Sequence, residues 1–582
     1  MSGEHPPVVG MELAEVEGLL ERIRPVVSAE DYARVAGLVQ MLVEVTRQVR
    51  EKGATIARLR RLLGHTSTEK TAAVLGEGSG AATGEESTRP GEDGSGRSVG
   101  PDAPGDREKE SRSKKKGKGH GRRPAAAYDA QHVPVPHESL HPGTGCPGCA
   151  RGKLHRLPEP ALYLRLFGQT PLVAVCWDCE RLRCGACGEV FTATPPEEAR
   201  GPKHAESAVS MMAYLRYGAG LPGHRLGRLQ ESLGVPVSAS TQWEVVRDRV
   251  PGLLPVYGEL VRQAADGSVV HNDDTYMRIL EFLGKRRARL LAGGDLPDPD
   301  RTGLFTTGIL SLTAAGPVAL FATGRKHAGE NLADLLRERS RGRTPPILMC
   351  DALDRNLPKG HEVVEGNCLA HGRRHIVEEA ENFPSECRYV LERLREVFHN
   401  EAHCKKEGLS GEARLRRHQE KSGPVMAALA AWMQEQLDEK RVEPNGGLGR
   451  AFSYLLRRWE KLTLFLRVPD APLENNICER ALKMAILHRR NSLFYRSQKG
   501  ARVGDLYMTL LYTAQLHGEN PFAYLTALLT HETDVAARPA DWVPWAYRAT
   551  LERLGKRDPE REVLSRRGWR PVGVVPSPPA PP

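Results

Sequence analysis

The chain has 582 residues, more than one hydrophobic core usually organises, so we expect several domains joined by linkers. Its 83 Lys and Arg residues against 73 Asp and Glu give a formal net charge of +10, which favours a polyanionic partner. The sequence contains no run of about 18 apolar residues and no signal peptide at its start, so we expect a cytoplasmic protein without a membrane partner.

Residues 1–75 are predicted to form an N-terminal helical segment. Apolar side chains recur there in alternating steps of three and four positions, except where Lys52 takes the expected place. They are Val35, Leu38, Leu42, Val45, Val49, Ile56, Leu59 and Leu63. This heptad seam is typical of a coiled coil, and we expect a homodimer or higher oligomer. A single amphipathic helix packed on a domain has similar spacing and remains the alternative.

Residues 76–124 are predicted to be a disordered basic linker. They are rich in Gly, Ser and charged residues and almost lack large apolar side chains, so burial cannot offset the entropy of ordering. The linker ends in a basic tract with Lys114, Lys115 and Lys116, which suits contact with DNA phosphates. A solvated segment that only keeps the chain soluble is an equally good interpretation.

Residues 125–200 are predicted to form a zinc ribbon. Two Cys-x-x-Cys pairs stand on Gly-containing turns and can supply four thiolates to a structural Zn²⁺ ion: Cys146, Cys149, Cys184 and Cys187. Strand-like stretches at 161–167 and 172–177 separate the pairs. A third pair, Cys176 and Cys179, can replace either knuckle or lie on a strand, and we favour the outer two pairs as ligands.

Residues 201–262 are predicted to be a helical region with the pattern of a helix-turn-helix. Leu226, Leu229 and Leu233 form one apolar face, Gly234 and the residues after it break the helix, and Ser240 is placed to cap a second helix. Such a pair can place its second helix in the major groove of DNA, but it is also a common packing unit.

Residues 263–375 are predicted to be the first part of an α/β core. A strand carries Asp273 in its middle, where burial makes a charge costly unless it is paired or holds a metal ion. Strands at 303–312 and 317–323, a helix at 328–338 and a strand at 346–350 follow, and Asp351 comes directly after the last. This order is typical of a ribonuclease H-like core.

The rest of the chain is predicted to be largely helical. Residues 376–460 form a helical insertion, 461–535 form the second part of the core with Glu479 on a helix, and 536–582 form a C-terminal tail. The fold class is therefore multidomain α+β. Two strand carboxylates and a helix carboxylate can hold two Mg²⁺ or Mn²⁺ ions for phosphoryl transfer, although spacing alone does not establish such a site.

Several motifs, taken together and in this order, resemble transposases of the insertion-sequence sixty-six family. They are His271 to Thr275, Asp351, Cys368 to Arg374, Asn475 to Leu482 and Asn491 to Phe494. The resemblance covers most of the chain and implies a DDE catalytic triad at Asp273, Asp351 and Glu479. Asp274 departs from the Glu often found at its position. Glu474 departs from the usual Asp and is the rival of Glu479 as third metal ligand.

Basic residues near these motifs are expected to contact DNA. Those on and around the two motif helices are Arg373, Arg374, Arg480, Arg489, Arg490, Arg496, Lys499 and Arg502. A solvated charged loop is the alternative for the group after Arg489. Cys368 and His371 have a ligand-like spacing, which ordinary core residues on one turn of helix share.

The sequence therefore predicts a DNA transposase that binds the terminal inverted repeats of an insertion sequence and cleaves and joins DNA. Its expected partners are the element ends, the target DNA and small accessory proteins of the same element. A ribonuclease H-like nuclease and an inactive DNA-binding derivative remain alternatives. A zinc-dependent hydrolase is disfavoured because four thiolates leave no open position on the metal.

Overall fold

The structure is a computed structural model that describes isolated positions between 22 and 39, residues 137–157 and 170–200 with short gaps, and residues 201–555 apart from position 297. The chain divides into two compact units, Met1–Glu85 and Glu86–Pro582. In the first unit, positions 35–37 are helical, and the rest of the expected seam lies outside the described residues. The predicted linker, with Lys114, Lys115 and Lys116, lies outside them as well.

The cysteine-rich region contains one short antiparallel hairpin. Its strands are β1 (Arg181–Arg183) and β2 (Val190–Thr192), and all six residues are exposed. The expected stretch 161–167 lies outside the described residues, whereas 172–177 carries no strand, so that prediction is wrong. Val173 and Val175 are 70% and 66% exposed, so their β-propensity is not supported by any packing surface.

Four helices lead into the core of the second unit. They are α4 (Glu206–Ala213), which continues as a π-helical turn, then α5 (Gly223–Ser232), α6 (Ala239–Asp248) and α7 (Val250–Ala265). The predicted pair of helices is present, but its packing differs: Leu226 is buried, while Leu229 and Leu233 are each 40% exposed. The N-cap of α6 is Ser238 and not the predicted Ser240, because the hydroxyl of Ser238 accepts the hydrogen bond from the Thr241 backbone amide.

A five-stranded mixed sheet forms the centre of this unit. Its strands are β3 (Val269–Tyr276), β4 (Phe305–Thr313), β5 (Gly316–Gly324), β6 (Ile347–Cys350) and β7 (Val364–Asn367), in the order β5-β4-β3-β6-β7. The first three pair antiparallel, and β6 and β7 join in parallel after helix α9 (Ala328–Leu336). The four predicted strands are confirmed, and β7 is an addition that the sequence did not indicate.

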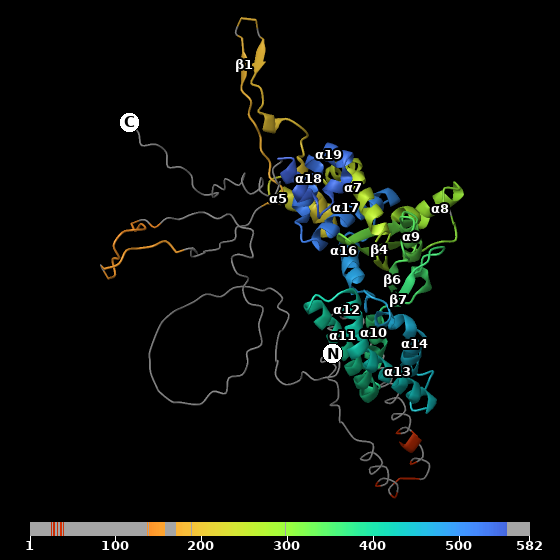
Figure 1. The fold of residues 1–582 in the computed structure, drawn as a ribbon. Coiled ribbons are helices and arrows are strands. Elements are labelled where there is room, and N and C mark those ends of the chain that lie inside the picture. Colours follow the sequence, from red (N-terminus) through yellow and green to blue (C-terminus); the bar gives the residue numbers. More distant parts are fainter. Residues whose placement is uncertain are drawn as a thin grey trace. The chain divides into compact units, whose positions relative to one another are not determined.

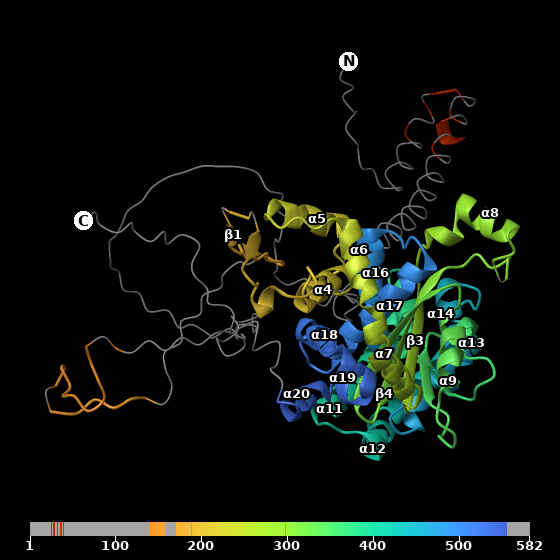
Figure 2. The same ribbon diagram turned by 90° about the horizontal axis from the view of Figure 1, so that it is seen from above.

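Long helices from the C-terminal part cover the sheet (Figure 2). Helix α16 (Asn476–Ser492) packs on β3 and β4 from one face, and α9 contacts the same strands from the other. Helix α17 (Gln498–Leu516) runs along the edge strand β5, where Thr513, Thr509 and Asp505 accept hydrogen bonds from the amides of Ala319, Phe321 and Thr323. The outward-facing amides of this edge are thus satisfied by side chains of a helix.

A helical block separates β7 from α16. It comprises α10 (Leu369–Glu379), α11 (Pro384–Lys406), α12 (Gly411–Lys421), α13 (Gly423–Asp438), α14 (Gly447–Arg457) and α15 (Trp459–Leu462). These helices gather on the side of the sheet away from α18 (Pro521–Thr530) and α19 (Glu532–Ala537), as Figure 1 shows. Their helical character agrees with the pattern in the sequence.

The C-terminal segment contributes to the core up to the end of the described residues. Within the stretch expected to be a tail, α20 (Tyr547–Arg553) forms, and Trp542 and Tyr547 are buried. Tyr524 of α18 donates a hydrogen bond to the Trp542 carbonyl at 3.0 Å. Among the described residues, none of the helices has the length and apolar character that a membrane span requires.

Candidate active site

Strand β3 directs its two adjacent acids to opposite faces of the sheet, because successive side chains of a strand alternate. Asp273 lies opposite Gly308 of β4, and a Cβ at Gly308 would lie 3.0 Å from the side chain of Leu482 on α16. Gly308 therefore allows α16 to approach the sheet closely on the face of Asp273. Asp274 points toward α9 on the other face.

Asp274 is a structural residue that holds the start of α9. Its carboxylate accepts hydrogen bonds from the Thr307 hydroxyl at 2.6 Å and from the Ala328 amide at 3.0 Å. His327 Nδ1 lies 3.2 Å from the same group. A carboxylate at the first amide of a helix satisfies an unpaired donor and interacts favourably with the helix dipole.

The pairing of β6 with β3 places Asp351 close to Asp273. The parallel register places Met349 beside His271, so two positions further along, Asp351 stands beside Asp273 on the neighbouring strand. Neighbouring strands are about 4.8 Å apart, which brings the two carboxylates to one place at the carboxyl end of β6. The side-chain amide of Asn356 donates a hydrogen bond to the Asp351 carboxylate and orients it.

Glu479 occupies the first turn of α16, and Asn475 ties that turn to β3. The Asn475 side chain donates to the Asn272 carbonyl at 3.0 Å, and its oxygen lies 3.0 Å from Nδ1 of His271. Because that oxygen only accepts, His271 donates from Nδ1. Burial lowers the pKa of His271 to about 4, so its ring is neutral. Both residues fix the start of the helix that carries Glu479.

The charges of Asp351 and Glu479 both act on Asp273. Burial raises the pKa of Asp273 to about 7, and these two charges contribute, while the Asp274 amide opposes the shift. Burial also raises the pKa of Asp351, against the influence of His371. Acidic charge gathered around Asp273 favours the binding of a cation there.

The three carboxylates are not among the groups of possible ligands whose atoms all lie within 4.8 Å of one another in the described part of the chain. Within the described part of the chain, the single group of three possible ligands within 4.8 Å of one another lies elsewhere, in the helical block. Ligands that bridge a pair of ions about 3.5–4 Å apart need not be so compact. Glu479 Oε1 is buried and forms no hydrogen bond with the described residues.

Glu474 occupies a different environment from Glu479. Its carboxylate accepts a hydrogen bond from the Asn476 side chain at 2.6 Å. Burial raises its pKa, while Lys405 and Arg480 are the cations that oppose this. The charge of Glu479, by contrast, acts directly on Asp273. The geometry therefore favours Glu479 over Glu474 as the third acid.

Cys368 and His371 contact different partners. The thiol of Cys368 is buried and accepts a hydrogen bond from the Asn475 amide at 3.1 Å. His371 Nε2 lies 3.5 Å from Glu479 Oε1, and its charge influences Asp351. His371 thus belongs to the carboxylate cluster, a placement that the spacing of the motif did not indicate.

The basic residues expected at the site fall into two groups. Those that are exposed are Arg480, Arg490, Arg496, Lys499 and Arg502. Arg489 instead donates to the Thr275 hydroxyl at 2.9 Å and to the Tyr276 carbonyl, and burial lowers its pKa. Arg373 is buried in α10 and engaged, while Arg374 beside it is half-buried and also engaged. Exposure therefore favours the first group for contact with DNA.

Each outer cysteine pair stands at a turn closed by backbone hydrogen bonds. The Cys146 amide donates to the Gly152 carbonyl at 2.8 Å, and the Cys184 amide donates to the Glu189 carbonyl at 2.9 Å. Backbone amides of Arg151 and Gly152 lower the pKa of Cys149, as a zinc knuckle requires. Cys176 and Cys179 lie in a stretch without secondary structure. A zinc ion shared by the outer pairs stays a prediction.

The compact group of possible ligands in the helical block consists of Glu401, Cys404 and His418. Arg414 contacts both oxygens of Glu401, at 2.9 and 3.1 Å, and His418 lies 3.0 Å from one of them. Although burial opposes ionisation, these hydrogen bonds lower the pKa of Glu401 to about 2. Because a guanidinium already occupies the carboxylate, the group is an ion-pair network joining α11 to α12.

Comparison with known proteins gives a family match and curated relatives. Residues 204–503, just over half of the chain, match the family model described as "Transposase IS66 family". The Sinorhizobium fredii protein called "Uncharacterized protein y4hP" is 26% identical over 441 residues, which cover 70% of this chain and 74% of that protein. A second protein of that organism, "Uncharacterized protein y4jD", is 25% identical over 429 residues, covering 70% of this chain and 79% of the relative.

Proposed function

Because this chain belongs to the IS66 family of transposases, we propose that it is a DDE transposase. It binds the terminal inverted repeats of an insertion sequence and cleaves and rejoins DNA with two divalent metal ions. The observation that carries this proposal is that the charges of Asp351, directly after β6, and Glu479, on α16, both act on Asp273 of the adjacent strand β3. The strand order β5-β4-β3-β6-β7, with α9 before β6, supports a ribonuclease H-like core.

The donor set suits Mg²⁺ or Mn²⁺, because all three groups offer hard carboxylate oxygens. When bound between them, two such ions supply activation of the attacking oxygen and stabilisation of the leaving 3′-oxygen. Asn356 and Asn475 orient Asp351 and the Glu479 helix, respectively. The neutral His271 adds no competing positive charge beside Asp273.

Cleavage and strand transfer can use this one site in turn. Water hydrolyses a phosphodiester at the element end, and the freed 3′-hydroxyl then attacks a phosphodiester of the target DNA. The bond to the new oxygen forms as the bond to the old 3′-oxygen breaks, so no covalent intermediate with the protein is needed.

The remaining modules support the handling of DNA ends. The cysteine knuckles, held by structural zinc, and the α5–α6 pair are proposed to bind the terminal repeats. The N-terminal seam is proposed to pair protomers so that two ends are processed together. Exposed Arg490 and Arg496 are proposed to hold the strand backbone beside the site.

Asp273→Asn and Glu479→Gln test the assignment directly. With a plasmid that carries the DNA flanking the gene on both sides, we expect Mg²⁺-dependent end cleavage to fall to background in both variants. Glu474→Gln is the matched control and should keep cleavage, because Glu474 is engaged with Asn476. Wild-type cleavage by Asp273→Asn would overturn the proposal.

A nuclease without strand transfer uses the same acids and is the second candidate. Gel analysis of the products separates the two, because joined molecules containing element and target sequence appear only when the 3′-hydroxyl attacks a second DNA. Cleavage without joined products would favour the nuclease. A folded wild-type protein that binds the ends without cutting them would favour an inactive DNA-binding derivative.

A further inference from the structure

Helix α8 (Gly284–Ala292) is an exposed, strongly basic helix inserted between β3 and β4. It contains no buried residue, and four of its nine residues are Lys285, Arg286, Arg287 and Arg289. It lies at the margin of the fold in both Figure 1 and Figure 2. Helices of globular proteins normally gain stability from an apolar face packed on the core, whereas every residue of α8 is at least partly exposed. Its sequence therefore calls for a role other than core packing.

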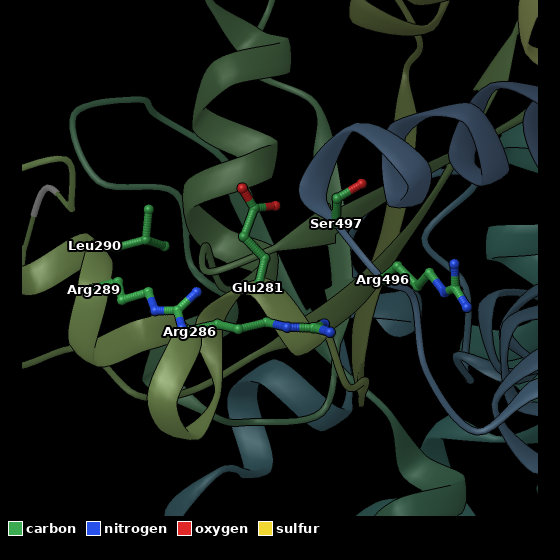
Figure 3. A pocket seen from close by; sticks show the side chains of 6 residues that line it. All are labelled: Glu281, Arg286, Arg289, Leu290, Arg496 and Ser497. Carbon is green, nitrogen blue, oxygen red and sulfur yellow. The ribbon is translucent and has the colours of Figure 1, made fainter.

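The helix borders a pocket of about 350 Å³ that it shares with the segment before α17. The residues lining this pocket are Glu281, Arg286, Arg289, Leu290, Arg496 and Ser497. Figure 3 shows the Arg286 side chain extending from α8 toward the segment that carries Arg496 and Ser497. Three arginines from two distant parts of the sequence thus line one hollow.

The floor of the pocket is fixed by backbone pairing. Ile279 and Tyr495 form a parallel bridge, and both side chains are buried. The Leu280 amide donates to the Tyr495 carbonyl at 2.9 Å, and the Glu281 amide donates to the Arg496 carbonyl at 3.2 Å. The two basic segments are therefore held side by side without a ligand.

The arginines that line the pocket are available to an anion. Among the residues that the structure describes, Arg286, Arg289 and Arg496 form no ion pair with an acid. Glu281 is the one acid of the lining, and its carboxylate accepts a hydrogen bond from the Gln498 amide at 2.7 Å. Three guanidinium groups against one engaged carboxylate leave the pocket positive.

We propose that α8 and the Arg496 segment form a clamp that binds phosphate groups of duplex DNA outside the carboxylate site. This inference rests on the proposed function, which supplies DNA as the partner. Guanidinium groups bind phosphate oxygens in two-point contacts, and Arg286 and Arg289 are one helical turn apart on one face. The clamp adds α8 to the surfaces that position the DNA.

The chain length limits where the clamp acts. Eight residues lead from Asp273 to Glu281, and an extended chain spans at most about 3.5 Å per residue, so Glu281 lies within roughly 28 Å of Asp273. At one base pair per about 3.4 Å of duplex, that distance corresponds to about eight base pairs between the cut and Glu281 at the pocket. The clamp thus grips the DNA that flanks the reacting bond.

The double variant Arg286→Ala/Arg289→Ala tests the clamp by the salt dependence of binding. Binding of a fluorescein-labelled 40-base-pair duplex of arbitrary sequence is followed by anisotropy at several salt concentrations without divalent metal. Each lost phosphate contact reduces the magnitude of the negative slope of log K against log salt by about 0.9. We therefore expect the slope of the double variant to be less steep by about 1.8. Circular dichroism should be unchanged, since Ala favours helix and α8 has no buried residue.

Two further variants complete the experiment. Arg341→Ala/Arg343→Ala removes two exposed charges before β6, at the opposite end of the sheet from Asp351, and should keep the wild-type slope. Arg286→Lys/Arg289→Lys should restore most of the slope, because the charges remain. Equal slopes in the wild type and the α8 alanine variant would overturn the clamp but leave the proposed function standing. Failure of the wild type to bind duplex DNA would overturn both.

Discussion

Asp273→Asn is expected to make the metal-free protein more stable while it abolishes activity. The pKa of Asp273 is raised from 3.8 to about 7 by burial and by its acidic neighbours. The folded state therefore binds more protons than the unfolded state between about pH 4 and pH 7, and stability falls as the pH rises through that window. Above pH 7 the folded protein carries a charge that its surroundings disfavour.

The size of the effect follows from the shift. Three pKa units at about 1.4 kcal/mol each set an upper bound of roughly 4 kcal/mol, and the partial solvent contact of Asp273 lowers the expected gain to about 1–3 kcal/mol. The asparagine side chain would keep the shape of Asp and an oxygen for the Asp274 amide, which lies 2.7 Å from the present carboxylate. Little else should change in the fold.

Thermal unfolding in EDTA at pH 8 and pH 5 measures this gain. We expect a higher Tm for Asp273→Asn at pH 8 and a smaller difference at pH 5, where the wild-type carboxyl is protonated. Added Mg²⁺ should stabilise the wild type and narrow the gap, because binding to the folded state adds stability. Glu420→Gln, on the exposed face of α12, is the matched control and should change nothing. A variant no more stable than the wild type at pH 8 would refute the argument.

Two other substitutions probe the supports of the site. Asn475→Ala removes the side chain that bonds to His271 and to the Asn272 carbonyl. The Mn²⁺ affinity measured by calorimetry should therefore fall by about 10- to 100-fold, as for other groups that orient metal ligands. Unchanged affinity would argue against a positioning role for Asn475. Leu493 has a φ of 67°, a conformation that glycine adopts at lower cost than leucine, and its side chain is 59% exposed. Leu493→Gly should therefore raise the free energy of unfolding in urea by about 1 kcal/mol. A loss of stability would show that the leucine side chain makes a compensating contact.

The strands that carry the acids could be predicted because their sequences are buried and rich in β-branched residues. Val269 and Val270 precede Asp273, and Ile347 and Leu348 precede Asp351, so each acid follows an apolar run. Strand β7 has no such run, since its sequence is Val-Glu-Gly-Asn and its Glu365 pairs with Lys461. A strand held by neighbours on the sheet leaves little signal in its own residues.

The candidate site was only partly predictable for the same reason. Asp274 is a capping residue, which becomes evident only once α9 is placed against β3. His371 was considered with Cys368 because of their spacing, whereas its neighbour in space is Glu479, more than a hundred residues away in the chain. Helix α8 buries none of its residues, so no core position in the sequence indicated it.

The side chains that α17 presents to β5 also decide how this sheet can associate. Four residues of helix advance about 6 Å and two residues of strand about 6.6 Å, so positions four apart on α17 stay in step with alternate amides of β5 over three contacts. A helix therefore takes the place of a sixth strand, and no incoming strand can add to that edge. Any strand that adds to the central sheet is therefore restricted to the β7 side.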